Sequence, residues 1–150
     1  MAKKILTLFV LLSLGAFCSA ESKNLFNGKD LTGWTGNPDF WKVENGIIVG
    51  ETTNQNKTSA NTFLIWEGGN LGDFELTLKA RVKGNNNSGI QYRSKVLNAK
   101  TWSVGGYQMD MHPAPNYLGM MYEERGRGII AQRGENVIID SEGKLSLIHI

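Results

Sequence analysis

Residues 41–49 read Trp-Lys-Val-Glu-Asn-Gly-Ile-Ile-Val and carry the clearest hairpin signal in the chain. Asn45 and Gly46 supply the positive φ angles that a tight primed turn requires, and apolar residues alternate on both sides of them. These nine residues therefore predict two short antiparallel strands joined by a two-residue turn.

Outward from this hairpin, short strand-like runs recur and are separated by Gly, Asn and Asp. Residues 74–82 alternate apolar and polar side chains, which predicts a strand with one buried face. Further strands are expected at 90–93, 107–112, 118–122, 128–132 and 137–140. Convincing helical periodicity and repeats of 20 to 50 residues are both missing from the sequence. The pattern predicts an all-β fold, either a sandwich or a barrel.

The N-terminal residues 1–20 are interpreted as a secretory signal that is removed from the mature protein. Lys3 and Lys4 precede an apolar run from Ile5 to Phe17, and this run is too short to span a membrane. Cleavage after Ala20 would leave residues 21–150 as one exported domain, in the periplasm or outside the cell. The single cysteine lies in the signal, so the mature chain is expected to contain no disulfide and no thiolate metal site.

The charge balance argues against nucleic acid as a partner. The whole chain carries 16 Lys and Arg against 14 Asp and Glu, and removal of Lys3 and Lys4 leaves 14 of each sign. A neutral, exported domain lacks the basic footprint of a nucleic-acid-binding protein. The sequence also lacks the Gly-x-Ser-x-Gly, His-Glu-x-x-His and phosphate-loop patterns, which excludes the common serine hydrolase, zinc protease and nucleotide-binding classes.

The last residues predict an unfinished sheet. A turn at 140–143 precedes residues 144–150, which start a new strand and end in Leu-Ile-His-Ile. An apolar strand without a partner exposes an edge that invites aggregation. We therefore expect the β-fold to be incomplete at its C-terminus, with further strands missing.

Five sequence blocks follow one another in order: LFNGKDLTGW at 25–34, WKVENGIIVG at 41–50, GDFEL at 72–76, NSGIQYR at 87–93 and GYQMD at 106–110. Together they resemble the 3-keto-disaccharide hydrolase domain family. The resemblance implies a secreted concanavalin A-like jelly-roll β-sandwich that acts on glycosides oxidised at C3 of a sugar ring. It also implies a longer domain, with a further Trp-containing strand and an Asn-Gly turn after the residues present here.

Three polar residues at alternate positions form the first candidate site. Gln108, Asp110 and His112 stand at i, i+2 and i+4 of one expected strand, so their side chains should share a face. Such a set suits a sugar-binding groove, proton transfer or weak metal binding. The alternatives are a solvated outer face and, for His112, which precedes Pro113, a loop position that caps the strand.

The second candidate set contains a guanidinium group and several aromatic rings. Gln91 and Arg93 are expected on one strand face, where Arg93 can bind sugar oxygens in a bidentate manner or stabilise an enolate. Tyr107 and Tyr122 can stack on a pyranose ring, and Arg125 lies beside an expected strand end. The alternatives are a solvated arginine and core positions for the aromatic residues.

The resemblance implies a mechanism of proton abstraction followed by elimination. A ketone at C3 acidifies the C2 hydrogen, and loss of that proton expels the C1 substituent, after which water can add. We expect His112 or Asp110 to act as the base, Arg93 to stabilise the oxyanion and Gln108 to orient the substrate. Substrate contacts are expected from Gln91, Tyr107, Gln108, Tyr122 and Arg125. A divalent metal could replace Arg93, and the sequence identifies no ligands for it.

Two other functional classes remain open from the sequence. A non-catalytic carbohydrate-binding module would use the same sandwich and the same polar face, because a fold alone does not determine chemistry. A structural or adhesive exported domain would leave that face solvated and would bind no sugar.

Overall fold

The computed structural model describes residues 22–84 and 86–147, and within them the chain is almost entirely built from short strands and loops. The expected signal at 1–20 lies outside the described residues. The elements are β1 Trp34–Thr35, β2 Trp41–Glu44, β3 Ile47–Gly50, β4 Ile65–Trp66, β5 Ser88–Asn98, the 3-10 turn η1 Ala99–Thr101, β6 Ser103–Met111, β7 Met121–Glu124, β8 Gly128–Ala131, β9 Val137–Ile139 and β10 Leu145–Leu147.

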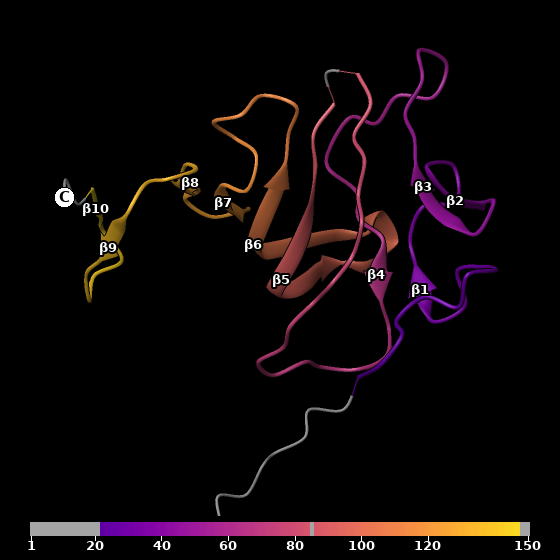
Figure 1. Cartoon of the computed structure of the whole chain (residues 1–150), viewed down its shortest axis with the longest axis horizontal. Helices are drawn as coiled ribbons and strands as arrows, with labels where there is room; N and C mark the ends of the chain where they lie inside the picture. The colour runs from indigo at the N-terminus through magenta and orange to yellow at the C-terminus, as the bar shows by residue number, and fades with distance from the viewer. Residues whose placement is uncertain (1–21, 85, 148–150) are drawn as a thin grey trace, which may run out of the picture.

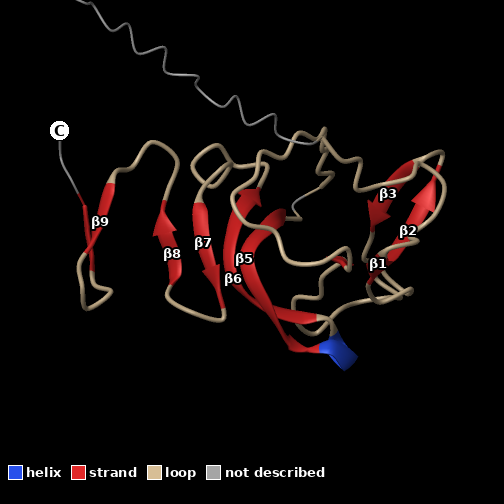
Figure 2. Cartoon of the chain, turned by 90° about the horizontal axis from the view of Figure 1, so that it is seen from below, coloured by secondary structure: helices blue, strands red, loops and turns tan. Residues whose placement is uncertain are grey.

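One four-stranded sheet, with the order β5-β6-β7-β8, forms the centre of the molecule (Figure 1). Three two-stranded sheets accompany it, formed by β1 with β4, β2 with β3, and β9 with β10. The strand pairs of these sheets are antiparallel, which confirms the prediction of an all-β fold. Figure 2 shows β5 to β8 side by side, with β9 beyond β8 and the β2–β3 hairpin at the other end.

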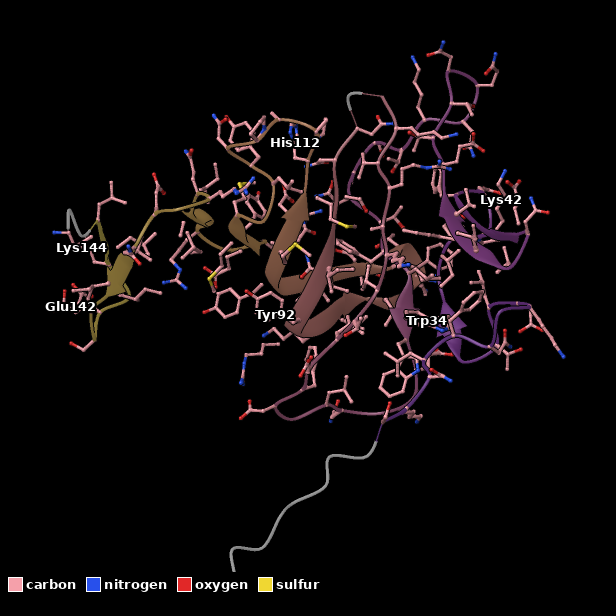
Figure 3. The ribbon with its side chains drawn as sticks, in the orientation of Figure 1. Trp34, Lys42, Tyr92, His112, Glu142 and Lys144 are labelled. Atoms are coloured by element: carbon pink, nitrogen blue, oxygen red, sulfur yellow. The ribbon has the colours of Figure 1, made fainter. Side chains whose placement is uncertain are left out.

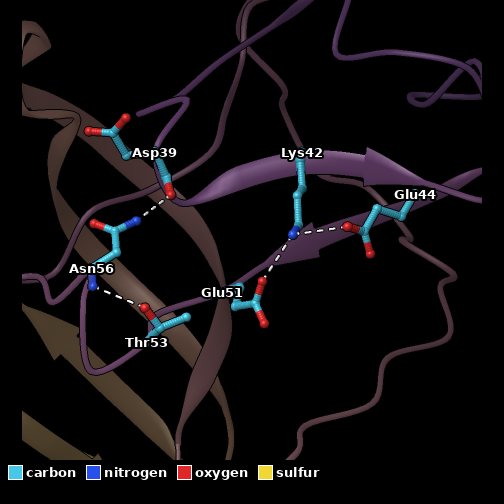
Figure 4. A network of polar contacts seen from close by, with 6 residues as sticks. All are labelled: Asp39, Lys42, Glu44, Glu51, Thr53 and Asn56. Carbon is cyan, nitrogen blue, oxygen red and sulfur yellow. Dashed lines mark hydrogen bonds and ion pairs between the residues drawn. The ribbon is translucent and has the colours of Figure 1, made fainter.

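The predicted hairpin is confirmed by the pairing of β2 with β3. Glu44 lies opposite Ile47, and the two turn residues Asn45 and Gly46 have φ angles of 52° and 74°. Both positive angles are those of a primed turn, whose twist matches the twist of the strands. Figure 4 shows that the Lys42 ammonium bridges two carboxylates across this hairpin, at 2.9 Å from Glu44 and 2.9 Å from Glu51. Hydrogen bonds to Glu44 and then to Glu51 raise the pKa of Lys42.

Residues 74–82 do not form the predicted strand. Within the described residues this segment has no ladder partner, although it runs beside β5 before the turn into that strand (Figure 1). Its alternating side chains do face one way, but Phe74, Leu76 and Leu78 remain 46%, 41% and 45% exposed. They border an apolar cleft of about 590 Å³ against β5 and β6. The alternation therefore predicts correctly that these apolar side chains point to one side. A buried strand also requires neighbouring strands that hydrogen-bond to it.

The two faces of β6 differ in an unexpected way. Tyr107, Met109 and Met111 point to one side, as predicted, and the two methionines line the apolar cleft. Gln108 and Asp110 point to the other side and are only 8% and 1% exposed, whereas Met109 is 37% exposed. The polar face of this strand is therefore the more deeply buried one. Buried polar groups require hydrogen-bond partners, so this face is the strongest candidate for a functional site.

The C-terminal part of the fold differs from the prediction in two respects. β7 begins only at Met121, because residues 115–119 form a turn in which Gly119 has a φ of 82°. The last strand is not partnerless: β10 pairs with β9, with Leu145 opposite Ile139. Arg127 also donates a hydrogen bond of 3.2 Å from Nη1 to the carbonyl of Gly143, which ties this hairpin to the β7–β8 turn. In the part of the chain described here, no helix has the length and apolar character that a membrane crossing needs.

Candidate functional site

Three side chains on the polar face of the central sheet are joined by hydrogen bonds. Gln91 on β5 lies opposite Gln108 on β6, and its Nε2 donates to Gln108 Oε1 at 2.9 Å. Gln108 Nε2 in turn donates to Asp110 Oδ1 at 2.6 Å. The second carboxylate oxygen of Asp110, Oδ2, is buried and has no hydrogen-bond partner among the described residues. The structure thus brings together Gln91, Gln108 and Asp110, and leaves one oxygen of the carboxylate with its lone pairs uncommitted.

A second buried carboxylate lies further along the same face. Tyr122 on β7 is opposite Gln108, so Glu124, two residues later, also points to this side. Glu124 is 5% exposed; Asn61 Nδ2 donates to its Oε2 at 2.9 Å, and Arg125 Nε lies 3.5 Å from its Oε1. Glu123 points the other way, toward Arg127, as the alternation predicts. Of the predicted site residues, Arg125 therefore contacts this carboxylate, and Tyr122 lies on the same face of the sheet.

Sequence reasoning did not identify Asn61 and Glu124 as site residues. The period of two along β7 places Glu124 on the face of Tyr122, so a signal for it existed once the strand pairing was known. Asn61 comes from the loop before β4 and meets Glu124 across 63 positions of sequence. No local pattern predicts a contact of that kind.

The two buried carboxylates lie at different levels of the sheet. Glu124 lies opposite Gly106, four residues before Asp110 on β6, and four residues of strand span about 13 Å of backbone. Asp110 and Glu124 also have different hydrogen-bond partners, so the structure does not join them as the two acids of a glycosidase.

Arg93 does not share the face of Gln91, so the prediction that the two residues lie together is wrong. The pairing of β5 with β6 shifts register between Tyr92 and Lys95, and Arg93 has a left-handed φ of 47°. A bulge of this kind re-aims the side chains that follow it. Arg93 consequently borders the apolar cleft and forms an ion pair with Asp73.

His112 lies just beyond the end of β6, in the loop that follows it (Figure 3). This is the capping position in the loop, and not the position on the strand face, that the sequence allowed for it. Its Nδ1 accepts a 2.9 Å hydrogen bond from the backbone N–H of Ala114, and its ring meets Tyr117 edge-on at 5.2 Å. A neutral imidazole that accepts at Nδ1 carries its proton on Nε2. His112 can therefore donate a hydrogen bond through Nε2, but in this form it offers no free base.

Tyr107 lies on the cleft side of the sheet, away from Gln108. Its ring centroid is 6.0 Å from that of Tyr92, and its hydroxyl accepts a 3.2 Å hydrogen bond from Arg127 Nη2. Burial, followed by the proximity of Tyr107, raises the pKa of Tyr92. On the same side, the hydrogen bond from Arg127 lowers the pKa of Glu123. The structure does not bring Tyr107 to the polar face on which Gln108 and Asp110 lie.

The polar face was also a predicted position for weak metal binding. Across residues 22–84 and 86–147, no three or more His, Cys, Asp or Glu side chains gather in a way that could hold a metal ion. The carboxylates of Asp110 and Glu124 belong to separate hydrogen-bonded groups.

Comparison with known proteins gives one result for this chain. Neither the curated proteins nor the solved structures include a match to it. A family model, described as the 3-keto-alpha-glucoside-1,2-lyase-like domain, matches residues 21–143 and so covers most of the chain. This match agrees with the resemblance seen in the five sequence blocks, and the antiparallel all-β architecture agrees with the concanavalin A-like fold of the family. The chain therefore belongs to the 3-keto-alpha-glucoside-1,2-lyase-like domain family.

Proposed function

We propose that this protein cleaves 3-keto-glycosides by removing the C2 proton, with Asp110 as the base, and by eliminating the C1 substituent. The observation that carries the proposal is the asymmetric carboxylate of Asp110. Gln108 holds Oδ1 at 2.6 Å, whereas Oδ2 has no partner within the described residues. An oriented carboxylate with one uncommitted oxygen has the lone pair that proton abstraction needs.

The reaction needs one base and no second carboxylate. The C2–H bond breaks and its proton passes to the base, while the electron pair forms the C1–C2 double bond and the C1–O bond breaks. The departing oxygen takes up a proton, and water can then add across the double bond to give the free 3-keto sugar. This scheme fits a site in which Asp110 and Glu124 belong to separate hydrogen-bonded groups.

The other two candidate bases are less suitable. Both oxygens of Glu124 are engaged, one by Asn61 and the other by Arg125. His112 already uses Nδ1 as an acceptor for the backbone of Ala114. Asp110 can thus accept the C2 proton at Oδ2 without breaking a hydrogen bond to any described residue.

A donor for the developing oxyanion at C3 is also required, because charge builds up on the ketone oxygen as the proton leaves. Arg125 borders the polar face, and its side chain is 52% exposed. It contacts Glu124, which lies at the level of Gly106, four residues from Asp110, so it is placed to bind a substrate oxygen remote from C3. Tyr122 lies directly opposite Gln108 on the adjacent strand, so we assign to its hydroxyl the donor role that the sequence suggested for Arg93. The signal-like residues 1–20 support a location outside the cytoplasm.

A second candidate function is a non-catalytic carbohydrate-binding module. It is favoured by the burial of Asp110, which is only 1% exposed, because a buried carboxylate can serve the fold alone. A binding module would hold a 3-keto sugar without exchanging its C2 hydrogen.

Incubation with a 3-keto-glucoside in D₂O distinguishes the two functions. The enzyme should release the 3-keto sugar, and deuterium should enter at C2. Asp110→Asn should lower the rate by about 10² to 10⁴-fold, the range expected for loss of a general base. Asp39→Asn, a change at an exposed carboxylate, serves as the matched control and should keep the full rate. Binding without turnover or deuterium exchange would reject the lyase and favour the binding module.

A further inference from the structure

The hydrogen bonds around Asp110 continue beyond Gln108 and Gln91 to a serine. Ser94 Oγ donates to Gln91 Oε1 at 2.8 Å, Gln91 Nε2 donates to Gln108 Oε1 at 2.9 Å, and Gln108 Nε2 donates to Asp110 Oδ1 at 2.6 Å. The four side chains form one continuous relay that crosses from β5 to β6. We refer to Ser94, Gln91, Gln108 and Asp110 as the Ser94–Asp110 relay.

The acceptor role of Asp110 Oδ1 fixes the direction of every bond in this relay. Because this oxygen accepts, Gln108 must turn its amide nitrogen toward Asp110 and its carbonyl toward Gln91. Gln91 must then donate to Gln108, and its own carbonyl is left to accept from Ser94. The Ser94 hydroxyl has a second acceptor at the Tyr92 carbonyl, 3.0 Å away, but its contact with Gln91 is shorter. Aligned donors polarise one another, which strengthens the last bond to the carboxylate.

The bulge in β5 gives Ser94 its place in the relay. In a regular strand Ser94 would share a face with Tyr92, and Arg93 would share a face with Gln91. The register shift between Tyr92 and Lys95, with Arg93 at a φ of 47°, reverses this order. Ser94 thereby reaches Gln91, while Arg93 turns to the opposite face. The irregular backbone at this point is what completes the relay.

Two glycines make room for the relay, one beside Gln108 and the other beside Ser94. A Cβ on Gly89 would lie 2.4 Å from Gln108 Cγ and 2.5 Å from its Cδ. A Cβ on Gly106 would lie 2.3 Å from Ser94 Oγ. Real Cβ atoms do not approach other heavy atoms so closely, so any larger residue would displace a member of the relay. The backbone around the relay is therefore shaped to fit these side chains.

We propose that Ser94 and Gln91 are positioning residues, which act through Gln108 to fix the orientation of the Asp110 carboxylate and to leave Oδ2 without a hydrogen bond from the described residues. The proposal rests on the proposed function for the role of Asp110. It changes the role of Gln91, whose amide nitrogen and carbonyl are both used inside the relay, from substrate contact to alignment of the base. A carboxylate without this support can rotate about its χ2 angle and lose the attack geometry.

The first test follows the relay by NMR and does not depend on activity. In Ser94→Ala, the side-chain amide resonances of Gln108 should shift, although Ser94 and Gln108 share no hydrogen bond and are linked only through Gln91. Ser146→Ala, a matched change at an exposed serine on β10, should leave the Gln108 resonances in place. Unchanged Gln108 resonances in Ser94→Ala would overturn the relay, whatever reaction the protein catalyses.

The second test uses an isosteric change that reverses the relay. Gln91→Glu replaces the donor to Gln108 by an acceptor, so Gln108 should turn its nitrogen toward Glu and its carbonyl toward Asp110. The kcat for the 3-keto-glucoside should fall by about 10 to 100-fold with little change in KM, as expected for a misplaced base. Gln91→Leu, which removes the donor without reversing the relay, should lower kcat less. Equal kcat in wild type and Gln91→Glu would overturn the positioning role, whereas loss of activity only in Asp110→Asn would leave the proposed function intact.

Discussion

Gln108 donates its side-chain amide to Asp110 two residues further along β6, with 2.6 Å between Nε2 and Oδ1. Both side chains are almost completely buried, while the methionines on the other face of the same strand border an open cleft. β6 is therefore more deeply buried on its polar face than on its apolar face. Such an arrangement costs free energy unless each polar group is satisfied, and functional sites are where proteins accept that cost.

Gly89→Ala should destabilise the protein, because the new Cβ would overlap the side chain of Gln108. We expect a loss of about 1 to 3 kcal/mol in the free energy of unfolding, typical of overpacking, together with lower turnover. Gly72→Ala is the matched control, since a Cβ there has no neighbour within 4 Å among the described residues. Urea denaturation should show a lower midpoint only for Gly89→Ala, and equal midpoints for the two variants would contradict the prediction.

Arg93 and Arg125 should differ in their importance for catalysis. Arg125 borders the polar face beside Glu124, whereas Arg93 is paired with Asp73 at the apolar cleft. Arg125→Ala should lower kcat/KM by about 10 to 100-fold, the loss expected when one hydrogen bond from a charged group to the substrate is removed. Arg93→Ala should retain most of the wild-type kcat/KM in the same assay. The opposite ranking would place the reaction on the cleft face and would reject Asp110 as the base.

The fold was predictable where local signals decide it. Asn45 and Gly46 determine the β2–β3 turn by their own backbone preferences, and the alternation at 107–111 correctly separates the two faces of β6. Residues 74–82 carry an equally regular alternation but form no strand in the described chain. Alternation reports which side chains share a face, whereas ladder hydrogen bonds depend on segments far away in sequence.

The site was predictable only in part, for the same physical reason. Gln108 and Asp110 share a face because they are two residues apart on an uninterrupted strand. Gln91 and Arg93 are also two residues apart, but the bulge in β5 begins after Tyr92 and turns Arg93 to the other face. Bulges depend on the pairing of both strands, and β5 on its own does not reveal one. The available signal for the relay was a glutamine two residues after a glycine in each strand, Gln91 after Gly89 and Gln108 after Gly106.

Asn61→Ala should destabilise the fold, because the buried carboxylate of Glu124 loses a hydrogen-bond donor. Asn61 donates to Glu124, which is only 5% exposed. Loss of a hydrogen bond to a buried charged group costs about 1 to 3 kcal/mol of unfolding free energy. Asn136→Ala, at an exposed asparagine before β9, should have little effect. Thermal unfolding of the two variants tests this, and an equal melting temperature would mean that Glu124 does not depend on Asn61.

The apolar cleft should bind a hydrophobic fluorescent dye such as anilinonaphthalene sulfonate. It has a volume of about 590 Å³ and is lined by exposed apolar side chains from 74–80 and from β6. Exposed apolar area of this kind attracts apolar ligands. Leu78→Asn should reduce the fluorescence gain, whereas Leu118→Asn, at a leucine that is also 45% exposed but lies outside the cleft, should not. Equal dye binding by both variants would locate the apolar site elsewhere.

Asp30 should make part of the stability depend on acid pH. Hydrogen bonds from the Thr32 side chain, then from the Asn27 side chain and the Thr32 backbone, lower its pKa from 3.8 to about 2. Because the folded pKa lies below the unfolded value, the stabilisation is fully present above about pH 4 and is lost as the pH falls through about 2.

Carboxyl carbon NMR should show Asp30 titrating near pH 2 in the wild type. In Asn27→Ala it should titrate at a higher pH, because one of the donors to the carboxylate is gone. Asp30→Asn should flatten the dependence of unfolding free energy on pH between about 4 and 2, since the group that releases its proton on folding has been removed. Titration of wild-type Asp30 at the ordinary value of 3.8 would show that the turn formed by residues 27–32 does not hold the carboxylate in solution.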